Sequence, residues 1–338
     1  MPPPIHSTLL GMMLGDSIGL PFEGLSAPRI HALLRDRPLR HSLIFRRGMV
    51  SDDTEHAVIT TSAFLAANNH PDRFSRALAT RLRLWFLCIP AATGLATARA
   101  CIKLLLGFPP SRSGVPSAGN GPLMRALPLG ALCTSDDQLK DLVARSTLIT
   151  HTDPRALHAA LAIALAARAA SNPNPAHTLS TQLPLFLPDG PVLLAAQSAI
   201  IAARANTSPA NFAASISCPR AISGYVLYTL PAVLFLWLSS PLNPRAAIES
   251  AVRRGGDTDT VAALVGGLAA ISAGPQSLPQ DWLDGIADFP CSVPWVRRLS
   301  ESNPPPSALR RSLLPLRNAL FLLVVLTHAA RRLLPPYG

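Results

Sequence analysis

The sequence predicts an all-α fold, in which residues 5–335 form a single compact multi-helix domain. Ala and Leu dominate the apolar residues, whereas aromatic residues, which favour strands, make up only 5% of the chain. No stretch of useful length alternates between polar and apolar residues, as a half-buried strand would. Hydrophobic residues account for 49% of the 338 positions and charged residues for 14%, a balance that excludes a disordered chain.

Helical periodicity between Pro and Gly residues defines the predicted elements. Two of them begin with clear signals, because Asp153-Pro154 and Asn243-Pro244 each place a capping side chain before a Pro at the first helical position. The Pro-rich, polar stretches 172–188 and 278–306 are interpreted as surface connections within the one domain. The predicted helices span residues 7–18, 53–68, 73–87, 94–106, 121–132, 137–147, 155–170, 191–204, 222–238, 244–253, 260–272 and 315–330.

The charge of the chain does not have the pattern of a nucleic-acid interface. The formal net charge is +11, but Lys103 and Lys140 are the only lysines, and the arginines are dispersed with no basic block among aromatic residues. We therefore expect no stable nucleic-acid partner. A positive field of this kind would still attract an anionic substrate.

The cysteines and the first residues indicate a cytoplasmic protein. The five cysteines are odd in number, widely spaced and without a Cys-x-x-Cys pair, which argues against a disulfide framework or a zinc site. The N-terminus shows no basic segment followed by an apolar one, as a secretory signal would. We expect a reducing compartment.

Two apolar segments are too short to cross a membrane, which needs about 20 apolar residues. Residues 225–238 are interrupted by Pro231, and residues 319–326 are shorter still and lie between Arg317 and His328. Both segments are interpreted as buried helices, and no membrane partner is expected.

The acidic residues are concentrated at the starts of two apolar helices. Asp52 and Asp53 stand together in Ser51-Asp-Asp-Thr54, and Asp257 and Asp259 stand in Gly-Gly-Asp-Thr-Asp-Thr260. Capping needs one such side chain per helix, whereas each start carries two carboxylates and a hydroxyl. Hard oxygen ligands of this kind suit Mg²⁺, Ca²⁺ or Mn²⁺ rather than zinc, and two facing clusters could hold two ions. Metal binding and multiple capping both remain open from these residues.

Four further features are ambiguous when each is considered alone. Glu23 is either a surface acid or, beside a metal, a ligand or general acid/base. Asp16, on an apolar helix, is either a satisfied structural acid or a support for the site. The loop Gly119-Asn-Gly121 is either a tight turn or a phosphate-binding loop. His151 is either a packed or capping histidine or a ligand-binding residue.

Taken together and in this order, the segments resemble the ADP-ribosylglycohydrolase family. The resemblance covers about residues 7–275, and the pair of acidic motifs at this separation is its most specific part. The matching motifs are Gly11-Met-Met-Leu-Gly-Asp-Ser-Ile-Gly-Leu-Pro-Phe-Glu23, Ser51-Asp-Asp-Thr54, Gly119-Asn-Gly-Pro-Leu-Met-Arg125, Thr150-His151 and Gly255-Gly-Asp-Thr-Asp-Thr260.

The resemblance implies an all-α fold with a binuclear metal cleft and two Mg²⁺ ions, for which Mn²⁺ could substitute. Glu23, or a metal-held carboxylate of Asp52 or Asp257, would handle the proton in catalysis. The metal ligands implied are Ser51, Asp52, Asp53, Asp257, Asp259 and Thr260, and the ADP-ribose contacts are Gly119, Asn120, Gly121 and His151.

The activity that the resemblance implies is removal of mono-ADP-ribose from modified protein side chains, most readily from arginine, by hydrolysis at C1″. An oxocarbenium-like transition state is expected for such chemistry. One alternative is a binding protein that neutralises an ADP-ribosylating toxin, with or without hydrolysis. Another is a metal hydrolase acting on a different anionic nucleotide. The expected partner is an ADP-ribosylated protein. The alternative that involves a toxin adds an ADP-ribosylating toxin or its target.

Overall fold

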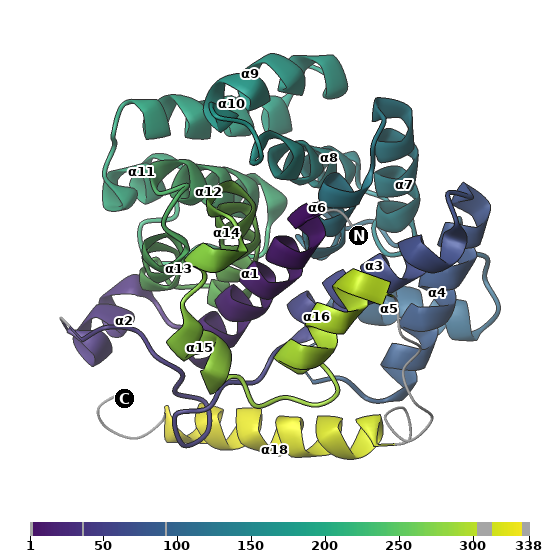
Figure 1. Ribbon diagram of the computed structural model, residues 1–338, viewed down its shortest axis with the longest axis horizontal. Helices are drawn as coiled ribbons and strands as arrows, with labels where there is room; N and C mark the ends of the chain where they lie inside the picture. Colours follow the sequence, from purple (N-terminus) through teal and green to yellow (C-terminus); the bar gives the residue numbers. More distant parts are fainter. Residues whose placement is uncertain (1–2, 36, 92, 303–312, 333–338) are drawn as a thin grey trace.

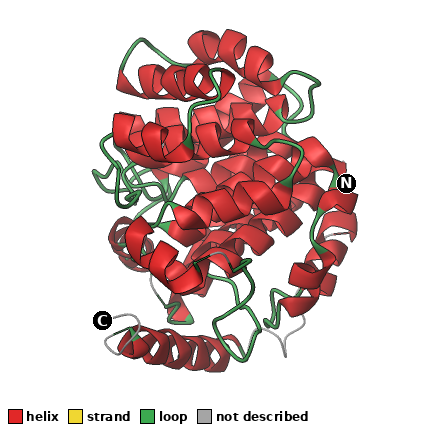
Figure 2. Cartoon of the chain, turned by 90° about the vertical axis from the view of Figure 1, so that its left-hand side faces the viewer, coloured by secondary structure: helices red, strands yellow, loops and turns green. Residues whose placement is uncertain are grey.

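The computed structural model describes residues 3–35, 37–91, 93–302 and 313–332, and every regular element in these ranges is a helix (Figures 1 and 2). The prediction of an all-α fold in one compact domain is confirmed. The α-helices are α1 (Pro3–Gly19), α2 (Ala27–Leu34), α3 (Asp52–Ala67), α4 (Pro71–Leu87), α5 (Leu95–Leu105), α6 (Leu123–Leu132), α7 (Asp136–Leu148), α8 (Pro154–Ala169), α9 (Pro175–Phe186), α10 (Pro191–Arg204), α11 (Pro209–Ser215), α12 (Val226–Ser239), α13 (Pro244–Arg253), α14 (Thr258–Ala273), α15 (Gln280–Gly285), α16 (Val293–Ser302) and α18 (Leu314–Arg331).

The interpretation of residues 172–188 and 278–306 as surface connections is wrong, because the first contains α9 and the second contains α15 and α16. The short helices α2 and α11 are also absent from the prediction. Pro175 and Pro209 explain part of the error, since each stands at the first position of its helix, where a missing N–H is harmless. These prolines start helices rather than break them.

Contact between the backbones of α1 and α14 organises the core. Gly11, Gly15 and Gly19 recur every four residues and therefore share one face of α1. A Cβ atom added at Gly15 would lie 1.9 Å from the carbonyl oxygen of Ala262 in α14. One added at Gly19 would lie 2.4 Å from the carbonyl oxygen of Thr258. The two helices can approach this closely only because α1 carries no side chain at these positions.

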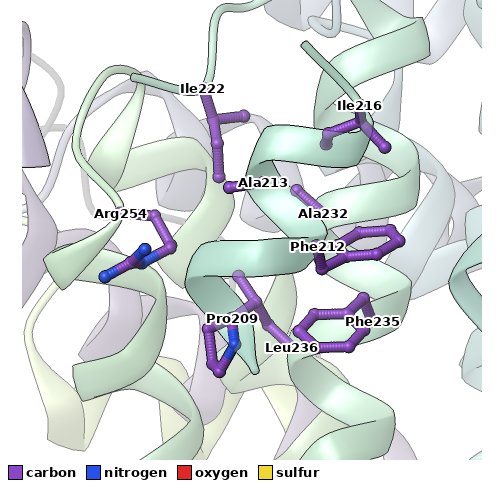
Figure 3. A pocket seen from close by; sticks show the side chains of 9 residues that line it. All are labelled: Pro209, Phe212, Ala213, Ile216, Ile222, Ala232, Phe235, Leu236 and Arg254. Carbon is purple, nitrogen blue, oxygen red and sulfur yellow. The ribbon is translucent and has the colours of Figure 1, made fainter. Parts of the chain in front are cut away.

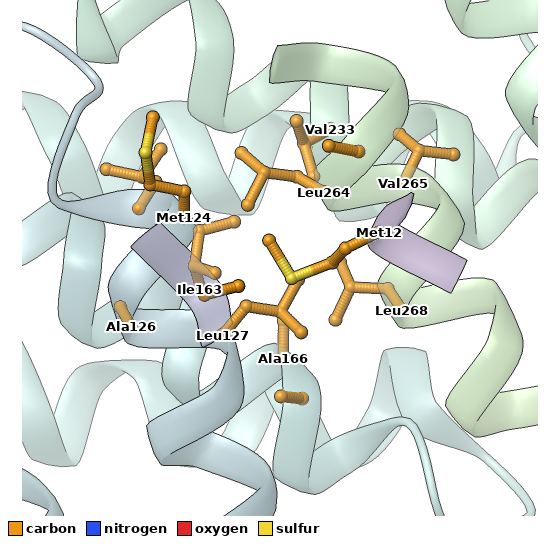
Figure 4. Packing of buried hydrophobic residues seen from close by; sticks show 14 of the residues in the cluster. Met12, Met124, Ala126, Leu127, Ile163, Ala166, Val233, Leu264, Val265 and Leu268 are labelled. Carbon is orange, nitrogen blue, oxygen red and sulfur yellow. The ribbon is translucent and has the colours of Figure 1, made fainter. Parts of the chain in front are cut away.

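Other helices enclose this pair on most sides. Met12 of α1 is fully buried and packs among Leu127 of α6, Ile163 of α8 and Leu268 of α14 (Figure 4). The contact between α6 and α8 is also close, since a Cβ atom at Gly130 would lie 2.2 Å from the carbonyl oxygen of Ala164. The core therefore fixes the end of α1, which is followed by Glu23, and the starts of α6 and α14, which are preceded by the Gly-Asn-Gly loop and by Asp257.

The two apolar segments that were predicted to be buried differ in their exposure. Residues 225–238 lie within and just before α12, whose middle is buried as expected. Residues 319–326 lie in α18, on the edge of the molecule (Figure 1), and Leu320, Leu323 and Leu326 are exposed, so their expected burial is wrong. Among the described residues, no helix combines the length and the apolar composition needed to cross a bilayer.

Replacement of Gly15 by Ala should destabilise the protein. The new methyl group has to displace the backbone of α14, and we expect the free energy of unfolding to fall by about 3 kcal/mol. Gly94→Ala is the matched control, since a Cβ atom there meets nothing within 4 Å, and its effect should stay below about 1 kcal/mol. Urea denaturation measures both, and equal stabilities of the two variants would contradict the proposed contact.

Candidate functional site

A cavity of about 570 Å³ opens where loops from distant parts of the chain meet. This volume lies within the range of about 300–1,000 Å³ that is usual for small-molecule sites. A second hollow, beneath α11, holds only about 10 Å³ and is mainly apolar (Figure 3). The large cavity is lined by Glu23, Gly24, Asp52, Gly94, Leu95, Ala96, Thr97, Ser117, Asn120, Gly121, Met124, His151, Ala221, Ile222, Ser223, Gly224, Gly256, Asp257, Asp259 and Thr260.

The Gly255-Gly256 pair joins the loop that carries Glu23 to the start of α14. Both glycines have positive φ, 69° and 86°, which favours glycine at each position. The amide of Gly256 donates to the carbonyl of Leu25, and its own carbonyl accepts from Gly24, both at 2.8 Å. A Cβ atom at Gly256 would lie 2.0 Å from the carbonyl oxygen of Ile222. The glycine pair therefore permits a close approach to neighbouring backbone on both sides.

Asn120 links the Gly-Asn-Gly loop to the second acidic motif. Its amide N–H donates to the carbonyl of Gly224 at 2.9 Å. Its side-chain Nδ2 donates to Oδ2 of Asp257 at 2.6 Å and to Oγ1 of Thr229 at 3.2 Å. The orientation of the Asp257 carboxylate is thus set by a residue more than a hundred positions away in sequence.

Asp16 of α1 holds the start of α3. Its buried carboxylate accepts hydrogen bonds from the backbone amides of Ser51 and Thr54, at 2.9 and 3.1 Å, and from the Thr54 hydroxyl at 2.5 Å. Burial outweighs these bonds and raises the pKa of Asp16 to about 6. Asp16 is therefore a buried structural acid with satisfied hydrogen bonds, and it also positions the first acidic motif.

The two acidic motifs meet at Asp53. Its Oδ2 accepts from the hydroxyl of Thr260 at 3.0 Å and from that of Ser51 at 3.4 Å. Its Oδ1 is buried and has no hydrogen-bond partner among the described residues. A buried acceptor left in this state is unfavourable, because it has lost its contact with water. Oδ1 of Asp53 therefore keeps an unused acceptor behind the cavity, whose lining does not include Asp53.

Negative charge accumulates around the cavity. Burial raises the pKa values of Asp52, Asp53 and Asp259 well above the ordinary carboxyl range, and neighbouring acids raise them further. Burial and then the charge of Asp257 raise the pKa of Glu23. Mutual repulsion of this kind is relieved by protons or by a cation.

Helix capping accounts for only part of the two motifs. At α3, the Ser51 hydroxyl accepts from the amide of Asp53 and acts as the cap. At α14, Asp257 occupies the capping position but makes no side-chain cap bond. Asp52 and Asp257 both line the cavity instead. In the described part of the chain, no three His, Cys, Asp or Glu side chains are gathered tightly enough to form a ready-made metal site.

His151 is held by a buried arginine through a threonine hydroxyl. Nη2 of Arg125 donates to Oγ1 of Thr150 at 2.5 Å, and Nδ1 of His151 lies 2.8 Å from the same oxygen. Among the described residues, the other acceptor near that hydroxyl is the carbonyl oxygen of Thr147, 3.5 Å away, so we infer that the hydroxyl proton points to Nδ1. His151 then carries its proton on Nε2, close to Gly119 at the cavity. Burial and the charge of Arg125 lower the pKa of His151 to about 3.

Residues at the C-terminal end of α18 hydrogen-bond to the backbone of the loop that carries Glu23. Nε2 of His328 and Nη2 of Arg332 both lie 2.9 Å from the carbonyl oxygen of Pro21. Nη1 of Arg332 donates to the carbonyl oxygen of Glu23 at 2.5 Å. The positive charge of Arg332 also acts to lower the pKa of Glu23, against the effect of burial.

The same helix holds the start of the first acidic motif. Arg317 is buried, and its Nη2 donates to the carbonyl of Val50, the residue before Ser51, at 2.8 Å. Its guanidinium also pairs with Glu55 at 3.0 Å and with Asp288 at 2.6 Å. Burial nevertheless raises the pKa of Glu55 to about 7. A helix outside the sequence motifs thus contacts both segments that carry acids.

Comparison with known proteins identifies the family to which the chain belongs and a solved structure with the same fold. The sequence profile of the ADP-ribosylglycohydrolase family matches residues 5–313. The chain belongs to the ADP-ribosylglycohydrolase family. An Archaeoglobus fulgidus relative, described as an uncharacterized protein, is 27% identical over 289 residues, which cover 84% of this chain and 91% of the relative. A solved structure described as an ADP-ribosylglycohydrolase-related protein complex shares the fold, with a TM-score of 0.62 and 23% identity over 95% of this chain and 98% of that one.

The structure brings most of the predicted site residues of this family member to one cavity. Three predicted residues do not line the cavity. Asp53 accepts a hydrogen bond from Thr260, which lines it, Ser51 precedes Asp52, and Gly119 lies beside His151. The predicted residues that line it are Glu23, Asp52, Asn120, Gly121, His151, Asp257, Asp259 and Thr260.

Two lining segments were missed. Residues 94–97, at the start of α5, and residues 221–224, before α12, contribute mainly small or apolar side chains and backbone. Neither segment contains an acid or a motif, so no signal in the sequence marked them. Of their two glycines only Gly224 approaches a neighbour closely, since a Cβ atom there would lie 3.0 Å from Oδ2 of Asp257.

Replacement of Asp16 by Ala should destabilise the protein through α3. It would leave two buried amides and a hydroxyl without their acceptor, and we expect a loss of about 3 kcal/mol in the free energy of unfolding. Asp137→Ala removes an exposed acid from the first turn of α7 and should change stability by less than about 1 kcal/mol. Chemical denaturation compares the two, and an Asp16→Ala loss no larger than the control would refute the capping role.

His151 should stay neutral across the physiological range. Because its pKa is lowered, we expect ¹⁵N NMR to show one protonated nitrogen, Nε2, from about pH 5.5 to 8, where a solvent-exposed histidine titrates near 6.5. In Thr150→Val, which removes the hydroxyl, the Nδ1 shift should change. Titration of His151 near neutral pH, or a proton on Nδ1, would contradict the hydrogen-bond order described above.

Proposed function

We propose that the chain is a Mg²⁺-dependent hydrolase that removes mono-ADP-ribose from modified protein side chains, with arginine as the acceptor linkage. The observation that supports this proposal is the convergence of both acidic motifs, Asn120 and His151 on one cavity. Family membership supplies the reaction class. The residues that face the cavity supply the groups that such a reaction needs.

The ligand set fits divalent cations. Carboxylate and hydroxyl oxygens are the donors that Mg²⁺ and Mn²⁺ prefer. The unpartnered Oδ1 of Asp53 and the raised pKa values of its neighbours are both relieved by a bound cation. Two such ions would supply charge stabilisation at the anomeric centre. The residues proposed to hold them are Ser51, Asp52, Asp53, Asp257, Asp259 and Thr260.

The neutral part of the cavity is proposed to bind ADP-ribose. Nε2–H of His151 is a donor, and a phosphate or ribose oxygen is the kind of acceptor it suits. Gly119 and Gly121 leave the backbone open beside His151, because a Cβ atom at either would lie within 3.4 Å of its ring. Asn120 holds Asp257 in place and so connects this part to the acids.

The proposed reaction breaks the bond between C1″ and a guanidine nitrogen, and a water oxygen forms the new bond to C1″. The water loses a proton and the leaving nitrogen gains one, so the reaction is balanced without a redox partner. Glu23, with its raised pKa, is the residue proposed to move the proton, with Asp52 and Asp257 nearby. An arginine linkage suits this cavity, because the cationic guanidinium would be attracted by its acids.

Release of ADP-ribose tests the proposal. With an arginine-mono-ADP-ribosylated protein as substrate, we expect release that requires Mg²⁺, stops in EDTA and falls at least about a hundredfold in Asp257→Asn. Asp137→Asn, which alters an exposed acid that does not line the cavity, is the matched control and should keep full activity.

The other outcomes are equally informative. Release from serine or from a nucleic-acid end, but not from arginine, would keep the chemistry and replace the acceptor. Absence of release from every substrate, together with demonstrated Mg²⁺ binding, would refute the hydrolase and favour a protein that blocks an ADP-ribosylating toxin.

A further inference from the structure

The outer face of α18 is apolar and uncovered. Leu316, Leu320, Leu323 and Leu326 are each between 54% and 61% exposed. Their spacing of three or four residues places them along one side of the helix. The opposite side is buried in the domain, where Phe321 packs against Leu20, Leu43 and Ala91. Helix α18 therefore has apolar side chains on both sides, and those on the outer side face away from the domain.

Two more apolar side chains are exposed beside this helix. Phe45, which is 99% exposed, occupies a tight turn closed by hydrogen bonds between the backbones of Ile44 and Arg47. Ile44 packs against the cluster that contains Phe321. Ile89, 72% exposed, follows Cys88, whose carbonyl accepts from Asn318 of α18 at 2.7 Å. We call Leu316, Leu320, Leu323, Leu326, Phe45 and Ile89 the basal face.

The charge that the sequence places beside the basal face is mostly positive, although the exposed acid Asp284 lies next to the Phe45 turn, where its carbonyl oxygen accepts from Arg47. Residues 37–51, which contain the Phe45 turn, include four arginines and no acid, and no acid occurs from residue 302 to the end of the chain. Arg46, next to Phe45, and Arg331, at the end of α18, are exposed. The whole chain carries a net charge of +11. A second copy of the chain would therefore bring like charges together, whereas an anionic surface would be attracted.

We propose that the basal face docks on an anionic membrane surface. The leucines, Phe45 and Ile89 enter the boundary between headgroups and acyl chains, and the flanking arginines contact lipid phosphates. Helix α18 lies in the plane of the interface and does not cross it, in accord with its length and composition. The proposal replaces the expectation, drawn from sequence, that no membrane takes part.

The docking is independent of the proposed hydrolase activity. Arg317, His328 and Arg332 point into the domain and hold the segments that carry Glu23 and Ser51. The leucines of α18 point the other way. The protein can therefore dock without giving up these contacts, and failure of the hydrolase assay would leave the docking proposal intact.

Vesicle co-sedimentation of the full chain tests the proposal. We expect binding to vesicles of phosphatidylserine and phosphatidylcholine, weaker binding as salt rises, and little binding to vesicles of phosphatidylcholine alone. Leu320→Gln combined with Leu323→Gln should weaken binding by at least about tenfold, because two exposed leucines no longer enter the lipid.

The matched control is Leu194→Gln combined with Ile201→Gln on α10, where both side chains are also about two-thirds exposed but lie across the molecule from α18 (Figure 1). This pair should bind vesicles like the unaltered chain, and urea denaturation should show all three proteins equally stable. Equal loss in both pairs, or no binding of the unaltered chain to anionic vesicles, would overturn the proposal. A lipid-independent dimer that only Leu320→Gln/Leu323→Gln dissociates would assign the face to a second copy instead.

Discussion

The backbones of α1 and α14 touch along the glycine face of α1, and the position of every acid in the site depends on this contact. Asp16 stands on α1 between Gly15 and Gly19, and Asp257 stands one residue before α14 begins. With these helices locked together, Asp16 can reach the start of α3 and hold it opposite the start of α14. The two motifs, about 200 residues apart, therefore meet because three missing side chains let α1 and α14 pack closely, and the hydrogen bond from Thr260 to Asp53 then joins them.

The cavity reverses the charge of the protein that surrounds it. A chain with a net charge of +11 lines its main cavity with Glu23, Asp52, Asp257 and Asp259 and with no Arg or Lys. Neutral donors take the place of cations near these acids: amides and hydroxyls satisfy Asp16, and Asn120 satisfies Asp257. Neutral partners leave the negative charge uncompensated. An incoming cation therefore finds carboxylates that are oriented but still repel one another.

The sequence predicted the helical fold and the acids that line the site because both leave local signals. Asp52 and Asp257 could be recognised since two acids at a helix start exceed what capping requires. The partners that orient them could not. Nothing in the sequence near Thr150 indicates that its hydroxyl contacts both Arg125 and His151. Nothing in the sequence of α18 indicates that Arg332 donates to the carbonyl of Glu23. Such contacts depend on tertiary packing. The leucines of α18 misled the interpretation for the same reason, since apolar periodicity cannot tell an inward from an outward face.

The pairing of the first long helix with one of the last has a consequence for the order of events during synthesis. At about 5–20 residues per second, roughly 12–50 seconds separate the appearance of α1 from that of α14. Throughout this interval α1, which is apolar on nearly all sides, lacks α14, the helix against which its glycine face packs. The nascent chain must hold its central helix in a provisional cluster or on a chaperone. A chain that ends before residue 258 would lack α14, α15, α16 and α18, and α1 would have no helix to cover its glycine face.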